Sequence, residues 1–140
     1  MAQKLRVALV ALLCALGAAA GCSGPGGKSE QTPQQTTLQD VADMLRAATQ
    51  PNGRGPTKLA DLDKVRDMYP RGYEAVKSGD VVVLWGAGVK GEGELAKGGE
   101  VIAYEKDAPT NGGYVLLSGG EVKKMSAAEF QAAPKAAGKK

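Results

Sequence analysis

Cys22 is the residue whose type and position point most directly to chemistry, because a cysteine thiolate is a strong nucleophile and the small residues at 19–21 leave space around it. Two basic residues, Lys4 and Arg6, precede a weakly apolar run over residues 7–20. A basic start, an apolar run and small residues, in this order, are typical of a secretory signal peptide. The run is shorter than the roughly 18–20 apolar residues that cross a bilayer, so we do not expect a permanent membrane span.

The segment 19–22, AAGC, resembles the lipobox of bacterial lipoproteins. The resemblance implies cleavage between Gly21 and Cys22 and transfer of a diacylglyceryl group to the Cys22 thiol. Residues 1–21 are then a lipoprotein signal peptide, and Cys22 is the first residue of the mature protein. The alternative is a freely secreted protein, because the alanines at 18–20 also fit the A-x-A pattern of an ordinary signal peptidase site.

Lipidation would determine where the protein resides. Two or more fatty acyl chains, such as palmitate, hold a protein stably at a membrane, since each buried methylene contributes about 0.8 kcal/mol. We therefore expect a protein anchored to a membrane through lipid on Cys22, on the extracytoplasmic (periplasmic) side. Ser23 after the cysteine, with no aspartate in its place, resembles the pattern that permits sorting to the outer membrane in Gram-negative lipoproteins. Residues 22–36, rich in Gly, Pro, Ser and Gln, are predicted to be a flexible tether.

The composition excludes several classes of site. The chain has no histidine and two cysteines, of which Cys14 would be lost with the signal peptide and Cys22 would carry lipid. Zinc, copper, haem and iron–sulfur sites therefore lack their usual ligands, and histidine-based triads lack their base. We predict no cofactor, no metal, no catalytic residue and no enzymatic activity. The net charge of +3 falls by two when Lys4 and Arg6 are removed, so nucleic-acid binding is not indicated.

A glycine pattern offers a second kind of chemistry. Gly86, Gly88 and Gly91 form G-x-G-x-x-G directly after an apolar run. In dinucleotide-binding proteins such a pattern opens a helix whose backbone amides meet a pyrophosphate. Further glycines interrupt the following dozen residues, so we expect a loop between two strands instead of a helix. The Gly-rich loop 86–99 remains open as a binding segment.

Two groups of carboxylates could bind a hard cation through oxygen ligands. Lys64 and Arg66 alternate with the first group, and neither group has EF-hand spacing, so an ion-paired surface is favoured over a calcium site. Five aromatic residues could line a ligand groove, but their apolar positions favour core packing. The carboxylates are Asp61, Asp63 and Asp67, then Glu92, Glu94 and Glu100, and the aromatic residues are Tyr69, Tyr73, Trp85, Tyr104 and Tyr114.

The remaining patterns predict one small domain over residues 37–133. Thr37 and Asp40 fit a capping box, followed by apolar residues at helical spacing as far as the turn at 51–56. A second helical pattern over residues 59–69 is expected to end at Pro70, with another turn of helix over 73–77 closed by Gly79.

The second half of the chain predicts strands. The run DVVVLW, residues 80–85, is expected to form a strand buried on both faces at the centre of a sheet. Residues 100–106 and 114–118 predict two more strands, the latter joined to a strand at 121–125 by a two-residue hairpin turn. Ser126 is expected to cap a last helix carrying Phe130, and residues 134–140 to form a disordered basic tail. The predicted fold is α+β, with two or three helices on one face of a small antiparallel sheet of about four strands.

The segments VIAYEK (101–106), GYVLL (113–117) and EVKKMS (121–126) resemble the closing hairpin of pilin-like bacterial envelope proteins. The resemblance covers roughly residues 58–130 and implies an α+β sheet and an envelope location. Gly119 stands where that family has Asp, and a lipobox replaces the prepilin leader, so pilus assembly is not implied.

Taken together, the patterns indicate a lipid-anchored cell-envelope protein that acts as a non-enzymatic interaction or structural module, with an envelope protein as its expected partner. The alternative is an extracytoplasmic ligand- or cation-binding protein that uses the Gly-rich loop 86–99.

Overall fold

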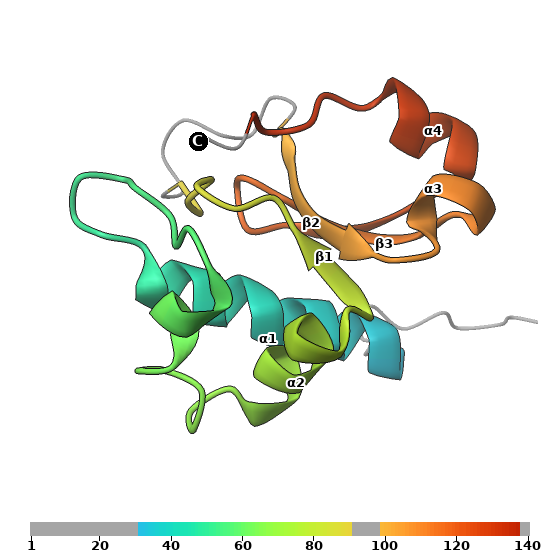
Figure 1. Cartoon of the computed structure of the whole chain (residues 1–140). Coiled ribbons are helices and arrows are strands. Elements are labelled where there is room, and N and C mark those ends of the chain that lie inside the picture. Colours follow the sequence, from blue (N-terminus) through green and yellow to red (C-terminus); the bar gives the residue numbers. More distant parts are fainter. Residues whose placement is uncertain (1–30, 91–98, 138–140) are drawn as a thin grey trace, which may run out of the picture.

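The computed structural model describes residues 31–90 and 99–137, which form four helices, one 3₁₀ turn and a four-stranded sheet (Figure 1). The strands pair antiparallel in chain order, β1-β2-β3-β4, so the sheet is a meander. The α+β prediction is therefore confirmed. The elements are α1 (Pro33–Ala48), η1 (Leu59–Leu62), α2 (Pro70–Ser78), β1 (Val81–Val83), β2 (Val101–Glu105), α3 (Ala108–Asn111), β3 (Gly113–Leu117), β4 (Val122–Met125) and α4 (Ala127–Ala132).

The first helix, α1, begins at Pro33, four residues before the predicted start at Thr37. Thr32 caps it, because its side-chain oxygen accepts a hydrogen bond from the Gln35 N–H at 3.2 Å. Proline suits the first helical position, where its missing N–H is not needed. Thr37 lies inside the helix instead of capping it, so the last residues of the predicted tether 22–36 belong to the folded domain.

The second helix was predicted in the wrong place, over residues 59–69. Leu59–Leu62 is a single 3₁₀ turn, and residues 63–69 are turns and bends. Helix α2 begins at Pro70, where the sequence pattern was expected to end, because proline is tolerated in the first turn of a helix but not in its interior. Its predicted closure at Gly79 is confirmed: this glycine has φ +83° and adopts the left-handed conformation that ends many helices.

The apolar strand of residues 80–85 forms, as β1, but it lies at one edge of the sheet and not at its centre. Val81 and Val83 are buried, because they join the core that α1 and α2 cover. Val82, on the other face, is only half-buried, so the strand is not buried on both faces as predicted. An apolar run shows that a strand is buried, but not whether strands or helices bury it.

The sheet is covered on both faces (Figure 1). Helices α1 and α2 cover one face, over a core that includes Leu38, Leu45, Ile102 and Leu116. The small helices α3 and α4 lie on the opposite face, where Phe130 of α4 packs with Val101, Val115 and Leu117 of the sheet. Helix α3 was not predicted, because four residues are too few for a helical pattern.

The aromatic residues are part of these cores, as predicted. Tyr104 contacts Phe130 with ring centroids 4.8 Å apart, on the face that α3 and α4 cover. The other four, Tyr69, Tyr73, Trp85 and Tyr114, are partly buried and pack against the core beneath α1 and α2.

The hairpin and the last helix largely follow their local signals. The β3–β4 turn has three residues, 118–120, rather than the predicted two, and Gly120 supplies the positive φ of +87°. The capping box of Ser126 and Glu129 is confirmed at the start of α4.

The described part of the predicted tail is not frayed. Lys135 pairs in parallel with Val101, and the backbone N–H of Ala136 donates to the Val101 carbonyl at 2.9 Å. The Val101 N–H in turn donates to the Pro134 carbonyl at 2.8 Å. These two bonds satisfy the backbone N–H and carbonyl of Val101, which lies beyond the end of β1 and has no partner there. Residues 138–140 of the predicted tail lie outside the described residues.

Candidate functional site

The predicted site at the amino terminus lies outside the described residues. Gly21 and Cys22 both fall in residues 1–30, as does most of the predicted tether. Cleavage and lipidation therefore stay predictions. Within residues 31–90 and 99–137, no helix combines the length and apolar character that a bilayer crossing requires.

The glycines of the G-x-G-x-x-G pattern allow two backbone segments to approach closely. The Gly86 N–H donates to the Pro56 carbonyl at 2.8 Å, and a Cβ on Gly88 would lie 2.7 Å from the Gly53 carbonyl oxygen. No helix starts in the described residues of this pattern, which end at Lys90. The described glycines therefore have a packing role and do not resemble a pyrophosphate site.

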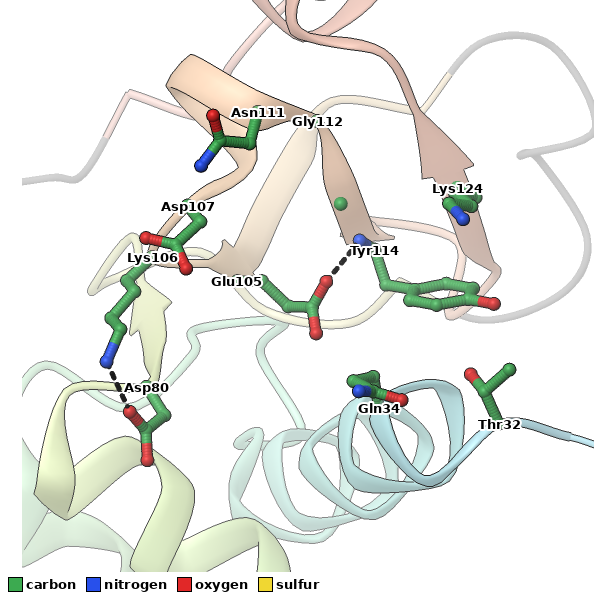
Figure 2. Close-up of a pocket in the computed structure, with 11 residues that line it drawn as sticks. Thr32, Gln34, Asp80, Glu105, Lys106, Asp107, Asn111, Gly112, Tyr114 and Lys124 are labelled. Carbon is green, nitrogen blue, oxygen red and sulfur yellow. Dashed lines mark hydrogen bonds and ion pairs between the residues drawn. The ribbon is translucent and has the colours of Figure 1, made fainter.

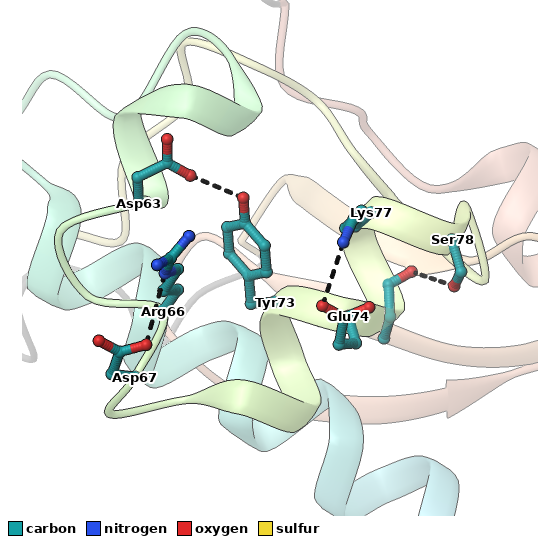
Figure 3. Close-up of polar contacts among 8 residues, drawn as sticks. Asp63, Arg66, Asp67, Tyr73, Glu74, Lys77 and Ser78 are labelled. Carbon is teal, nitrogen blue, oxygen red and sulfur yellow. Dashed lines mark hydrogen bonds and ion pairs between the residues drawn. The ribbon is translucent and has the colours of Figure 1, made fainter.

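The first predicted carboxylate group does not converge on a point, because each aspartate has its own partner. Asp61 accepts hydrogen bonds from the Thr57 N–H at 2.8 Å and its hydroxyl at 2.9 Å, and these bonds lower the pKa of Asp61 by favouring its charged form. Asp63 accepts the Tyr73 hydroxyl at 2.6 Å, which raises the pKa of Tyr73 (Figure 3). Asp67 lies 3.4 Å from Arg66.

Only one member of the second carboxylate group, Glu100, lies within the described residues. Glu92 and Glu94 lie outside the described residues, and Glu100 lines a cavity of about 230 Å³ between the 52–54 turn and the segment 86–90. Among the described residues, no three acidic or other ligand side chains are grouped so that they could hold a metal ion.

A larger groove, which the sequence did not indicate, lies beside the first turn of α1 (Figure 2). It consists of two adjoining cavities of about 490 and 440 Å³, which share Gln34, Asp80 and Glu105. We call these two cavities together the α1 groove. Its position results from the fold, because the start of α1, the start of β1, the end of β2 and the start of β3 meet at this end of the sheet.

Glu105 is the half-buried carboxylate of the α1 groove. One of its oxygens, Oε2, accepts a hydrogen bond from the Tyr114 N–H at 2.7 Å. Gly113 makes room for this arrangement, because a Cβ there would lie 2.7 Å from the same oxygen. None of the ion pairs among the described residues includes Glu105. The Glu105 carboxylate therefore has no cationic partner in this part of the chain.

A neighbouring carboxylate of the groove is already neutralised. Asp80 accepts the Lys106 ammonium at 2.8 Å and the Ser78 hydroxyl at 2.8 Å (Figure 2 shows the ion pair). These hydrogen bonds lower the pKa of Asp80, and the same carboxylate raises the pKa of Lys106. The pair joins the start of β1 to the residue after β2.

Lys124 from β4 also lines the groove, and its ammonium lies 5.8 Å from the centre of the Tyr114 ring. The other charged lining residues are Asp107 in the larger cavity and Arg71 and Glu74 in the smaller one. In Figure 2 the Tyr114 side chain lies between Glu105 and Lys124. The α1 groove thus presents a carboxylate, an aromatic ring and an ammonium, a set suited to binding a ligand that carries both charges. Sequence reasoning missed Glu105 and Lys124, because no motif links residues that the folded strands bring together.

Comparison with protein-family models, with curated proteins and with solved structures finds no match to this chain.

Proposed function

We propose that this protein is a lipid-anchored protein of the cell envelope, whose α+β domain is a non-enzymatic interaction module on the extracytoplasmic side of the outer membrane. The observation that carries the proposal is Cys22 behind the small residues 19–21 and the apolar run 7–20. The pilin-like pattern of the closing hairpin agrees with an envelope location.

The position of the folded domain supports the proposal. Its first helix is capped by Thr32, so about ten residues separate the domain from Cys22. A chain of that length reaches at most about 35 Å when fully extended. The domain would therefore stay close to the membrane surface while remaining free to contact a partner.

Two cysteine variants test the anchor. Cys22→Ala is expected to abolish incorporation of labelled palmitate and to remove the mature protein from the membrane fraction. Cys14→Ala is the matched control, because it removes the other thiol from the apolar run and should leave labelling unchanged. Equal labelling of the Cys22→Ala variant and the unaltered protein would contradict the proposal.

The interaction role is tested by chemical crosslinking in intact cells followed by mass spectrometry. One recurrent envelope protein joined to residues 37–133 is expected. Crosslinks that scatter over unrelated proteins, with none recurring between replicates, would count against an interaction module.

The second candidate function is ligand or cation binding by the Gly-rich loop 86–99. It is favoured by the cavity beside the segment 86–90, which Arg54, Lys90 and Glu100 line. A calcium titration followed by calorimetry tests it, with Glu100→Gln expected to weaken binding. Absence of binding heat with the full chain would exclude the calcium form of this candidate.

A further inference from the structure

The α1 groove lies at the end of the domain where the chain enters the fold. Thr32 caps α1 and also lines the groove, and Gln34 lies between its two cavities. Under the proposed function this end follows the tether directly. The groove is therefore the cavity of the described domain that lies nearest, along the chain, to the lipid-bearing residue.

The charges that the groove offers to a ligand have both signs. Glu105 has one oxygen bonded to the Tyr114 N–H, and its carboxylate forms no ion pair among the described residues. Lys124 contacts the Tyr114 ring as a cation, and none of those ion pairs includes it either. Lys106 and Asp80 neutralise each other at the far side. In the smaller cavity, Arg71 pairs with Asp40 and Glu74 pairs with Lys77. The groups left for a ligand in the larger cavity are thus the carboxylates of Glu105 and Asp107 and the ammonium of Lys124.

This pattern matches a small zwitterion. A protonated amine donates hydrogen bonds to a carboxylate, and a phosphate accepts them from a lysine ammonium. The larger cavity, about 490 Å³, lies within the range of known small-molecule sites. An amino-phosphate group fits these charges better than a simple anion, which Glu105 and Asp107 would repel, or a simple cation, which would leave Lys124 without a partner.

We propose that the α1 groove binds the phosphoethanolamine headgroup of a membrane lipid, with its ammonium at Glu105 and its phosphate at Lys124. The lipid source rests on the proposed function, whereas the headgroup chemistry rests on the groove alone. Bound lipid would orient the start of α1 toward the bilayer and leave the opposite end of the domain available to a partner.

A titration of the full chain with phosphoethanolamine tests the chemistry, in a maltoside detergent and with ¹⁵N NMR. The Tyr114 amide is the direct probe, because it donates to Glu105. We expect a saturable shift of this amide, with binding at least about tenfold weaker for ethanolamine or inorganic phosphate alone.

Four variants locate the site. Glu105→Gln keeps an oxygen that can accept the Tyr114 N–H but removes the charge, and Lys124→Gln removes the ammonium. Each is expected to weaken phosphoethanolamine binding about tenfold. The matched controls are Lys123→Gln, on the adjacent residue of β4, and Glu121→Gln, because neither lines the groove. The affinity of the two controls for phosphoethanolamine should stay within about twofold of the unaltered protein. The proposal would be overturned if the Tyr114 amide showed no saturable shift, or if all four variants lost affinity equally.

Vesicle flotation of the Cys22→Ser full chain decides whether the ligand is a membrane lipid or a soluble amino-phosphate, because this variant cannot carry lipid on residue 22. Vesicles of phosphatidylethanolamine and phosphatidylcholine in equal amounts are expected to carry clearly more of the protein than pure phosphatidylcholine, whose quaternary ammonium has no N–H to donate to Glu105. The apolar run 7–20 contributes to binding of both kinds of vesicle, so the difference between them measures the headgroup preference. Binding of free phosphoethanolamine without this vesicle preference would assign the groove to a soluble amino-phosphate and overturn the lipid source. Failure of the palmitate labelling described above would leave both of these readouts unaffected.

Discussion

The close crossing of α1 and α2 at Gly72 gives the sharpest stability prediction. Gly72 is buried in the first turn of α2, and a Cβ at this position would lie 3.0 Å from the backbone of Asp40 and Val41 in α1. Ordinary Cβ contacts are longer than 3.4 Å, so Gly72→Ala requires the helices to separate by several tenths of an ångström. Separation would loosen the core beneath both helices.

Two opposing effects determine how far Gly72→Ala changes the free energy of unfolding. Overpacking a fitted contact costs about 1–3 kcal/mol. Alanine is favoured over glycine by about 1 kcal/mol in a helix interior, and by less in the first turn. We therefore expect Gly72→Ala to lower the free energy of unfolding by about 1 kcal/mol, and Gly72→Val, with two more methyl groups and β-branching, to lower it by about 3 kcal/mol.

Urea unfolding followed by circular dichroism measures both values. A loss of 1 kcal/mol should lower the melting temperature of a domain of this size by about 4–8 °C. Lys77→Ala, on the exposed side of the same helix, is the control and should change stability by less than about 0.5 kcal/mol. If Gly72→Ala is as stable as the unaltered protein and Gly72→Val no less stable than Gly72→Ala, the close crossing does not constrain the fold and the reasoning is refuted.

Three further predictions follow from polar contacts and from the docked tail. Ser126→Ala removes the capping box of α4 and should cost about 1 kcal/mol of unfolding free energy in urea melts, whereas Ser126→Asp, which can still cap, should cost clearly less. The folded protein lowers the pKa of Asp80, so this carboxylate contributes to stability above pH 3.8, its unfolded pKa, and the contribution is lost as the pH falls through the lower folded pKa. The folded protein raises the pKa of Lys106, so this ammonium contributes to stability below pH 10.5, its unfolded pKa, and the contribution is lost at higher pH. Between these limits Asp80→Asn should be less stable than the unaltered protein, and the difference should shrink toward both extremes in urea melts run at several pH values; a difference independent of pH would contradict the ion-pair origin. Deleting residues 134–140 exposes Val101 and removes its two backbone hydrogen bonds, with an expected cost of about 1–3 kcal/mol, whereas deleting only 138–140 should leave the urea midpoint unchanged.

Local sequence signals predicted the elements that depend on local chemistry. The strands near 100–106 and 114–118 and the capping box of Ser126 are found where short apolar runs, turn glycines and a capping serine place them. These signals act within a few residues of each other, so they can be recognised without knowing the rest of the fold.

Some residue types fit two different local structures, and at these positions the sequence prediction chose the wrong one. Pro70 can end one helix or begin another, and only the packing of α2 against α1 selects the second outcome. Thr32 and Thr37 both fit a helix cap, and the earlier one is used. The apolar run of β1 requires burial, which helices provide here at the edge of the sheet.

The sequence by itself determined the class of fold, the hairpin and, as a prediction, the fate of Cys22, because these depend on residue types and short spacings. Only the tertiary structure decided where the α1 groove lies and which charges face it. Glu105 and Lys124 are separated along the chain and come from different strands, and they line one cavity because β3, which carries Tyr114, lies between β2 and β4. The hairpin turn indicates that β3 and β4 are neighbours, but the pairing of β2 with β3 and the side chains that face the groove depend on the packing of the whole domain.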